Sequence, residues 1–226
     1  MTFYSIAIDG PSGAGKSSMA RTIARKYGFI YVDTGAIYRT VGLAAHRLGI
    51  SCSDETEVSK LLPGLRIEMK YDDAGEQKMY LDGEDVSSEI RLPEISICAS
   101  DVSALPAVRA YLLEMQRSMA RTNNVIMDGR DIGTVVLPDA DVKIFLTASS
   151  IARANRRLLQ LMEKGIRSDL EDVLKEIEYR DKQDSSREIA PLKPADDAVI
   201  VDTSDIGIDE TVELLSSIIE EKLDIG

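Results

Sequence analysis

The stretch Gly10-Pro11-Ser12-Gly13-Ala14-Gly15-Lys16-Ser17 decides how the rest of this 226-residue sequence is interpreted. It fits the pattern G-x-x-x-x-G-K-[ST], in which glycines let backbone N–H groups turn toward phosphate oxygens. An apolar run typical of a buried strand precedes it, and residues 17–27 carry apolar side chains at helical spacing. A strand, a loop and a helix N-terminus form the context in which this pattern binds phosphate, which argues against a glycine-rich turn that binds nothing. We therefore expect a P-loop in which Lys16 reaches the β- and γ-phosphates of a nucleotide and the Ser17 hydroxyl ligates Mg²⁺.

The composition is that of an acidic globular protein. Hydrophobic residues make up 44% and charged residues 29% of the chain, and the formal net charge is −12. Because a surface that coats nucleic acid needs a basic face, this charge argues against a nucleic-acid partner, but it does not exclude a nucleotide ligand. No apolar run reaches the roughly 18 residues that span a bilayer, and the first residues lack a signal-peptide pattern. We expect a cytoplasmic protein without a membrane partner, in which Cys52 and Cys98 are free thiols.

Five short apolar segments predict the strands of the fold. They begin near residues 3, 29, 125, 142 and 198, and segments with helical patterns separate them. This alternation is typical of an α/β fold with a doubly wound, parallel, five-stranded sheet. The pattern changes in residues 63–92, where apolar and polar residues alternate around turn signals, as in a small antiparallel β module. We expect one domain over residues 1–226 with this module inserted.

Candidate site residues follow the ends of the predicted strands, where ligands bind to such sheets. Asp128 ends the third strand and is placed to hold Mg²⁺, although an aspartate before glycine also fits a simple turn. Arg130 follows it and could approach a transferred phosphoryl group. After the second strand come Thr34 and Arg39, for which a helix cap and a surface arginine are the simpler interpretation from these residues alone.

Two groups of charged residues lie at helical spacing in the last third of the chain. Arg153, Arg156 and Arg157 would share one helix face and could meet phosphate groups, or they could form a solvated face paired with glutamates. Arg180, Asp184 and Arg187 are about one helical turn apart, which also fits simple ion pairing. The single histidine, His46, fits an exposed helix position, so catalysis would depend on lysine, arginine and metal.

Taken together, these motifs resemble bacterial cytidylate kinases over essentially the whole chain. The segments that carry the likeness are GPSGAGK at 10–16, DTGAIYR at 33–39, GEDVS at 83–87, DGRDIGTVV at 128–136, KIFLTAS at 143–149, RD at 180–181 and REIAPL at 187–192. The P-loop is shared by many kinases, but the combination is specific. The resemblance implies direct transfer of the γ-phosphoryl group of ATP to CMP or dCMP with Mg²⁺, by an enzyme that we expect to be a monomer.

The resemblance also implies a role for each matched position. The residues that would bind ATP are Gly10, Pro11, Ser12, Gly13, Ala14, Gly15, Lys16, Ser17 and Ser18. Those that would bind the acceptor are Thr34, Arg39, Ser100, Arg109, Arg130, Asp131, Arg180, Asp184 and Arg187. Catalysis would depend on Lys16, Arg130, Arg153 and Arg157, with Ser17 and Asp128 toward the metal. Residues 63–92 would help to close the monophosphate side, and residues 153–168 would form a lid over the phosphates.

The acceptor residues have chemistry that suits cytosine. An aspartate at position 131 can accept from the cytosine N4 amine, whereas uracil presents an oxygen there and would be disfavoured. An adenylate- or shikimate-type kinase would share the P-loop and the lid but lack the set of Ser100, Arg109 and Asp131. A GTPase switch would need an Asn-Lys-x-Asp segment, which the sequence does not contain.

Overall fold

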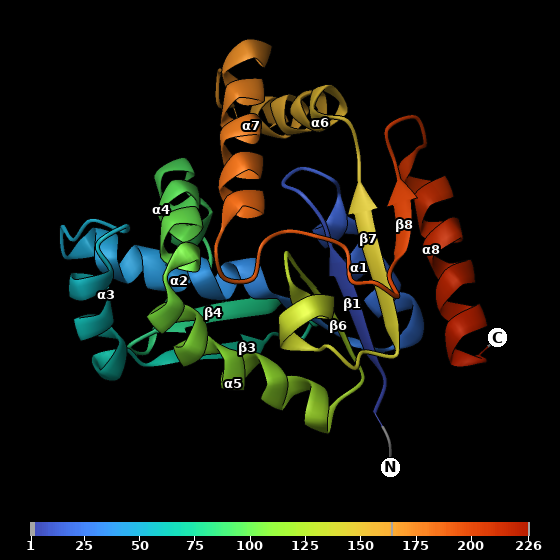
Figure 1. Ribbon diagram of the computed structural model, residues 1–226, viewed down its shortest axis with the longest axis horizontal. Coiled ribbons are helices and arrows are strands. Elements are labelled where there is room, and N and C mark those ends of the chain that lie inside the picture. The colour runs from blue at the N-terminus through green and yellow to red at the C-terminus, as the bar shows by residue number, and fades with distance from the viewer. Residues whose placement is uncertain (1–2, 164, 226) are drawn as a thin grey trace.

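The computed structural model describes residues 3–163 and 165–225, and its centre is a five-stranded parallel sheet (Figure 1). The strands are β1 (Ser5–Asp9), β2 (Ile30–Asp33), β6 (Val125–Gly129), β7 (Val142–Thr147) and β8 (Val199–Asp202), in the order β2-β6-β1-β7-β8. All four pairings are parallel. The predicted doubly wound α/β fold is therefore confirmed, with the strand that leads into the P-loop at the centre of the sheet.

Apolar helices cover both faces of this sheet. Ile6 and Ile8 of β1 pack against α1 (Lys16–Tyr27) and α8 (Ile208–Leu223) on one face. Ala7 points to the other face, where α5 (Pro106–Thr122) and η3 (Ile132–Val136), a single π-helical turn, complete the core. This π-helical turn, which begins shortly after the end of β6, was not predicted from the sequence.

The predicted β module is a three-stranded antiparallel sheet that packs against helices. Its strands are β3 (Ile67–Tyr71), β4 (Gln77–Leu81) and β5 (Glu84–Asp85), and the third of these was not predicted. Short 3₁₀ turns, η1 (Leu62–Gly64) and η2 (Glu89–Arg91), flank the sheet. Its apolar side chains share one core with α2 (Thr34–Arg47), α3 (Glu55–Leu61), α4 (Pro93–Ala104) and α5. The module is thus fixed to the helices that lead into the site.

Two further helices stand beyond the carboxyl ends of the strands (Figure 1). They are α6 (Ser150–Glu163) and α7 (Leu170–Ser186), and they pack against each other through a small apolar cluster of their own. The segment expected as a lid, residues 153–168, covers most of α6 and the connection to α7, and Lys164 within it lies outside the described residues. This helix pair therefore shares little of the main core.

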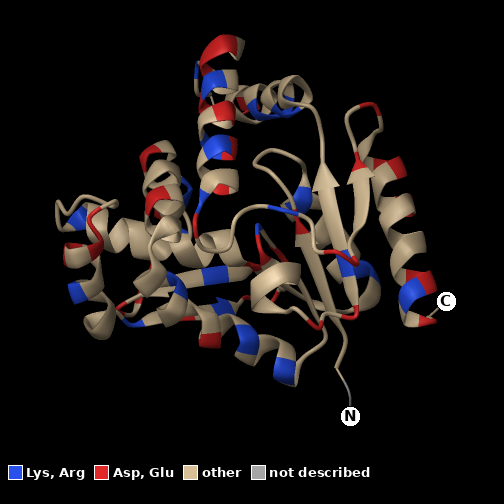
Figure 2. Ribbon diagram, in the orientation of Figure 1, with Lys and Arg blue, Asp and Glu red and all other residues tan. Residues whose placement is uncertain are grey.

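Acidic residues are spread over peripheral helices such as α3, α7 and α8 (Figure 2). His46 lies exposed on α2, as predicted. Within the described ranges, no helix is both long and apolar enough to cross a membrane.

Candidate active site

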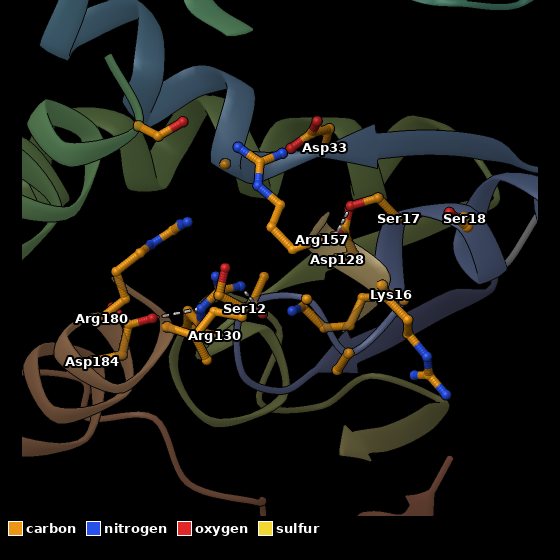
Figure 3. Close-up of a pocket in the computed structure, with 18 of the residues that line it drawn as sticks. Ser12, Lys16, Ser17, Ser18, Asp33, Asp128, Arg130, Arg157, Arg180 and Asp184 are labelled. Atoms are coloured by element: carbon orange, nitrogen blue, oxygen red, sulfur yellow. Dashed lines mark hydrogen bonds and ion pairs between the residues drawn. The ribbon is translucent and has the colours of Figure 1, made fainter. Parts of the chain in front are cut away.

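A cavity of about 700 Å³ opens at the carboxyl ends of β1, β2 and β6 (Figure 3). The P-loop forms one side, the ends of α4 and α5 form another, and α6 and α7 cover it. Every residue predicted for the site lines this cavity except Gly10, Pro11 and Arg153. Residues from distant parts of the sequence therefore converge on one space.

The P-loop has a backbone that only glycine permits at its start. Gly10 has a positive φ, and a Cβ there would lie 1.9 Å from the carbonyl oxygen of Leu146 on β7. Gly13 and Gly15 also have positive φ, and Gly15 at the N-cap of α1 offers no side-chain acceptor. The first-turn N–H groups of α1 are thus available to an anion, and the helix dipole favours one.

The lysine of the P-loop is buried within the cavity wall. The Nζ atom of Lys16 donates to the carbonyl of Pro11 at 2.7 Å. Burial and the neighbouring Arg130 lower the pKa of Lys16 well below its ordinary value, while Asp128 and Asp184 oppose that shift. A buried ammonium group with a single neutral acceptor is well placed to gain a phosphate oxygen as a further partner.

Oxygen atoms suited to Mg²⁺ lie beside the P-loop. The Ser17 hydroxyl donates to the carboxylate of Asp128 at 2.8 Å, and Tyr31 donates to the other oxygen of Asp128 at 2.8 Å. Burial and the nearby Asp33 carboxylate raise the pKa of Asp128, so a cation here would offset an unfavourable negative charge. Among the described residues no three His, Cys, Asp or Glu side chains gather into a metal cluster. The Ser17 hydroxyl and the Asp128 carboxylate are oxygen ligands of the kind that Mg²⁺ takes, so the residues present fit this ion.

The structure corrects the simpler interpretation of Thr34 as a helix cap and of Arg39 as a surface arginine. Asp33 is the N-cap of α2, accepting from the N–H of Ala36 at 2.9 Å, whereas the Thr34 hydroxyl donates to the carbonyl of Asp128 at 2.7 Å. Arg39 is not a surface arginine: it lines the cavity, and its Nε atom is buried without a hydrogen-bond partner. The unpaired Nε atom is therefore available to a group that enters the cavity.

An ion-paired cluster joins α7 to the segment after β6. The Nε atom of Arg130 donates to Asp184 at 2.7 Å (Figure 3). Arg187 pairs with the other oxygen of Asp184. Burial would raise the pKa of Asp184, but Arg130 and Arg187 outweigh it and hold that pKa below its ordinary value. Arg180 is held differently: its nearest carboxylate, on Glu176, is 3.8 Å away, and its Nε atom is buried and unpaired. Burial, with Arg130 and Arg39 nearby, lowers the pKa of Arg180 to about 10.

A second buried ion pair lies between α5 and the end of β6. Arg109 pairs with Asp131, with both side chains less than a tenth exposed, and also donates to the carbonyl of Ser103 at 3.1 Å. The Ser100 hydroxyl on α4 faces the same cavity, where it is buried and has no hydrogen-bond partner. Together these side chains supply a guanidinium donor, a carboxylate acceptor and an unused hydroxyl, which is a recognition set for a polar heterocycle.

The lid arginines, expected as one group, have separate environments. Arg153 is buried and donates to the carbonyls of Ala148 at 2.9 Å and Ser12 at 3.0 Å, and to Asp181 on α7 at 2.6 Å. Its guanidinium therefore holds α7 and the P-loop together instead of facing the cavity. Arg157 lines the cavity and forms no hydrogen bond or ion pair with any described residue.

Sequence reasoning gave no role to Asp9, Asp33 or Arg91. Arg91, in η2 of the inserted module, pairs with Asp33 at 2.8 Å on the cavity wall, and no local pattern marks an arginine in a short turn. Asp9 ends β1 and accepts from the N–H groups of Ile132 and Gly133. Like Asp128, Asp9 is an acidic residue at the end of a buried strand, so the pattern that predicted a role for Asp128 could also have pointed to Asp9.

Comparison with known proteins gives a consistent result. A model of the family described as cytidylate kinase matches residues 6–221. The chain is 52% identical over 217 residues to a cytidylate kinase of Lactobacillus johnsonii and 53% identical over 217 residues to one of Lactobacillus gasseri, in both cases covering 96% of this chain and 94% of the relative. Among solved structures, an uncharacterized protein from Eubacterium ventriosum is similar with a TM-score of 0.50 at 12% identity, covering 96% of this chain and 98% of that one. At such low identity the structural likeness concerns the fold alone.

Proposed function

This chain belongs to the cytidylate kinase family, and on that premise we propose that it transfers the γ-phosphoryl group of ATP directly to CMP and dCMP, giving ADP with CDP or dCDP. The family expected from the sequence motifs is thereby confirmed. One observation carries the choice of acceptor: the buried set of Arg109, Asp131 and Ser100 shares a single cavity with the P-loop. A phosphate donor and a cytosine could therefore be bound side by side.

On the donor side, residues 10–18 would hold the phosphates of ATP. The positive-φ glycines and the uncapped N-terminus of α1 favour triphosphate binding. Lys16 would exchange its contact with Pro11 for phosphate oxygens, and its charge would stabilise the transferring group. Ser17 and Asp128 would supply ligands to Mg²⁺, which when bound neutralises charge on the β- and γ-phosphates.

On the acceptor side, the arginines would position the monophosphate. Arg39 lines the cavity with its Nε atom buried and without a partner, and Arg130 follows the strand that carries Asp128. These two arginines would grip the acceptor phosphate. Arg180 and Asp184 would contact the sugar, with Arg187 in the same pocket. These contacts would hold the attacking oxygen in line with the γ-phosphoryl group, which is most of what phosphoryl transfer requires.

For base selection, Asp131 would accept a hydrogen bond from the cytosine N4 amine. Arg109 and Ser100 would donate to the ring oxygen and nitrogen. Uracil places an oxygen opposite Asp131, and two acceptors facing each other in a buried site cannot both be satisfied. CMP would therefore be preferred over UMP.

Closure would complete the site before transfer. We place the lid in residues 153–168 and assign residues 63–92 to the monophosphate side. The weak packing of α6 and α7 on the main core supports the lid, and the Arg91–Asp33 pair links the inserted module to the cavity. Closure of both parts would exclude water, so that the phosphoryl group passes to CMP. We expect the enzyme to work as a monomer in the cytoplasm, where the free thiols of Cys52 and Cys98 stay reduced.

A coupled ADP-release assay with Mg·ATP tests this proposal. The acceptors to compare are CMP, dCMP, UMP, AMP, dTMP and shikimate, each measured against a control without acceptor. We expect turnover concentrated on CMP and dCMP. Faster turnover of another acceptor would mean that the protein is a P-loop kinase but that CMP is not its acceptor. Turnover of none of the six would contradict the proposed activity.

A further inference from the structure

The π-helical turn η3 follows an aspartate that does not cap it. Asp131 occupies its N-cap position, where an aspartate usually accepts from the N–H groups two or three residues ahead. Here Asp131 makes no such bond, and its carboxylate pairs with Arg109 across the acceptor pocket. The N–H groups at the start of η3 must therefore be satisfied by another group.

Asp9 provides the missing cap from a neighbouring strand. Its two carboxylate oxygens accept from the N–H of Ile132 at 2.8 Å and from the N–H of Gly133 at 2.7 Å. Asp9 is buried, at 4% exposure, and its backbone is in register with Gly129 of β6. The opposite end of η3 is also held from outside, because Arg117 donates to the carbonyls of Val135 and Val136 at 2.9 Å each.

Burial raises the pKa of Asp9 to about 6, and the nearby charge of Asp131 adds to this rise. The two amide donors and the charge of Lys16 oppose it, because they favour the ionised carboxylate. The side chain of Lys143 on β7 also borders this turn at Gly133, and its ammonium group is paired with Asp197. Burial therefore works against an ionised carboxylate at this position, and the two amide donors work in its favour.

From this geometry we propose that Asp9 is a positioning residue for acceptor recognition: by capping η3 it leaves the Asp131 carboxylate free to face Arg109 and the base. The proposal deepens the function given above and rests on it where it names CMP. Without Asp9, the N–H of Gly133 would be a buried donor without a partner, and Asp131, at the N-cap position of η3, is the carboxylate nearest to it along the chain. The pocket would then lose its acceptor for the cytosine amine.

The test is a double-mutant cycle read as base selectivity. Asp9→Asn keeps the size of the side chain but offers one acceptor where the carboxylate offers two. We expect it to lower the ratio of kcat/KM for CMP to kcat/KM for UMP about tenfold, the equivalent of one buried hydrogen bond, while the KM for ATP stays within about twofold of that of the unmodified enzyme. In an Asp131→Ala background the same change should alter the ratio by less than about twofold, because Asp9 acts through Asp131.

Matched controls separate this role from a general loss of structure. Asp141→Asn is the control, because Asp141 accepts from the N–H of Ser5 at 2.7 Å at the opposite end of β1, and its selectivity ratio should not change. A thermal melt checks that the Asp9→Asn protein folds. An unchanged ratio in Asp9→Asn, or an equal loss with and without Asp131, would overturn the proposal.

A crystal structure of Asp9→Ala separates this inference from the proposed function. We expect the Asp131 carboxylate to turn away from Arg109 toward the N–H groups of η3, whatever the acceptor of the enzyme is. An Arg109–Asp131 pair that stays intact would overturn the positioning role. If the unmodified enzyme did not phosphorylate CMP but this rotation were observed, the proposed function would fail and the role of Asp9 would stand.

Discussion

The two halves of the cavity are built in different ways. The half that we propose for the donor is formed by the P-loop, residues 10–18, of which residues 12–18 line the cavity. It is one continuous segment whose shape depends on left-handed glycines and on the first turn of α1. The acceptor half is assembled from side chains that lie far apart in the sequence. Its six arginines and three aspartates are Asp33, Arg39, Arg91, Arg109, Arg130, Asp131, Arg180, Asp184 and Arg187.

This difference shows how two kinds of selectivity are encoded. Backbone N–H groups can hold any triphosphate, so a short local motif is sufficient for the donor half. Choosing one nucleotide by base, sugar and phosphate requires side chains, which the tertiary fold must bring together. The acceptor half has twice as many arginines as aspartates in a protein with a net charge of −12, so local charge decides what binds there.

The largest effect should come from removing the charge of the donor half. We expect Lys16→Ala to lower kcat about a thousandfold, because the ammonium group stabilises charge that develops during transfer. The KM for CMP should change much less, since Lys16 lies on the P-loop and not in the base pocket. Initial rates with varied CMP and ATP would measure both constants. A kcat near that of the unmodified enzyme would contradict the role of Lys16.

The selectivity for CMP over UMP should depend on one carboxylate oxygen of Asp131. In Asp131→Asn the amide can donate to a uracil oxygen, and we expect the CMP/UMP selectivity ratio to fall about a hundredfold. Kinetics with both nucleotides at saturating ATP would measure it. The loss should leave the KM for ATP unchanged, and a ratio that does not move would remove Asp131 from base recognition.

Substitution of two arginines one turn apart on α6 should separate a structural role from a catalytic one. Arg157→Ala should lower kcat about tenfold with little change in melting temperature, because Arg157 faces the cavity without a partner among the described residues. Arg153→Ala should destabilise the fold by about 3 kcal/mol, since it leaves Asp181 and two carbonyls unpaired. Thermal melts beside kinetics would separate the two, and identical profiles would show that the lid arginines act as one group.

The smallest effect concerns a hydroxyl with no partner. Ser100→Ala should raise the KM for CMP about fivefold through one lost hydrogen bond. The same change should stabilise the free enzyme by about 1 kcal/mol, because the buried Ser100 oxygen has no hydrogen-bond partner. A higher KM for CMP together with a higher melting temperature is the expected signature. A variant that is less stable than the unmodified protein would mean that the Ser100 hydroxyl is satisfied before CMP binds.

The same contrast explains what could be predicted from the sequence. The P-loop, the five strands and the helix after the P-loop depend on local patterns such as apolar periodicity, and the structure has them where they were expected. The environment of Arg39 was wrong in the simpler interpretation, because its burial depends on residues that pack around α2 from elsewhere. The cap that Asp9 gives to η3 joins residues 123 and 124 positions apart, and no local pattern encodes such a pair.

The measurement that tests the central claim most directly is calorimetric titration of the Lys16→Ala protein with CMP and, separately, with a non-hydrolysable ATP analogue and Mg²⁺. If the two halves of the cavity bind independently, the dissociation constant for CMP should stay within about twofold of that of the unmodified enzyme, while that of the ATP analogue should rise at least about tenfold. Equal weakening of both ligands would contradict the account, because it would mean that the acceptor half depends on the donor half for its shape.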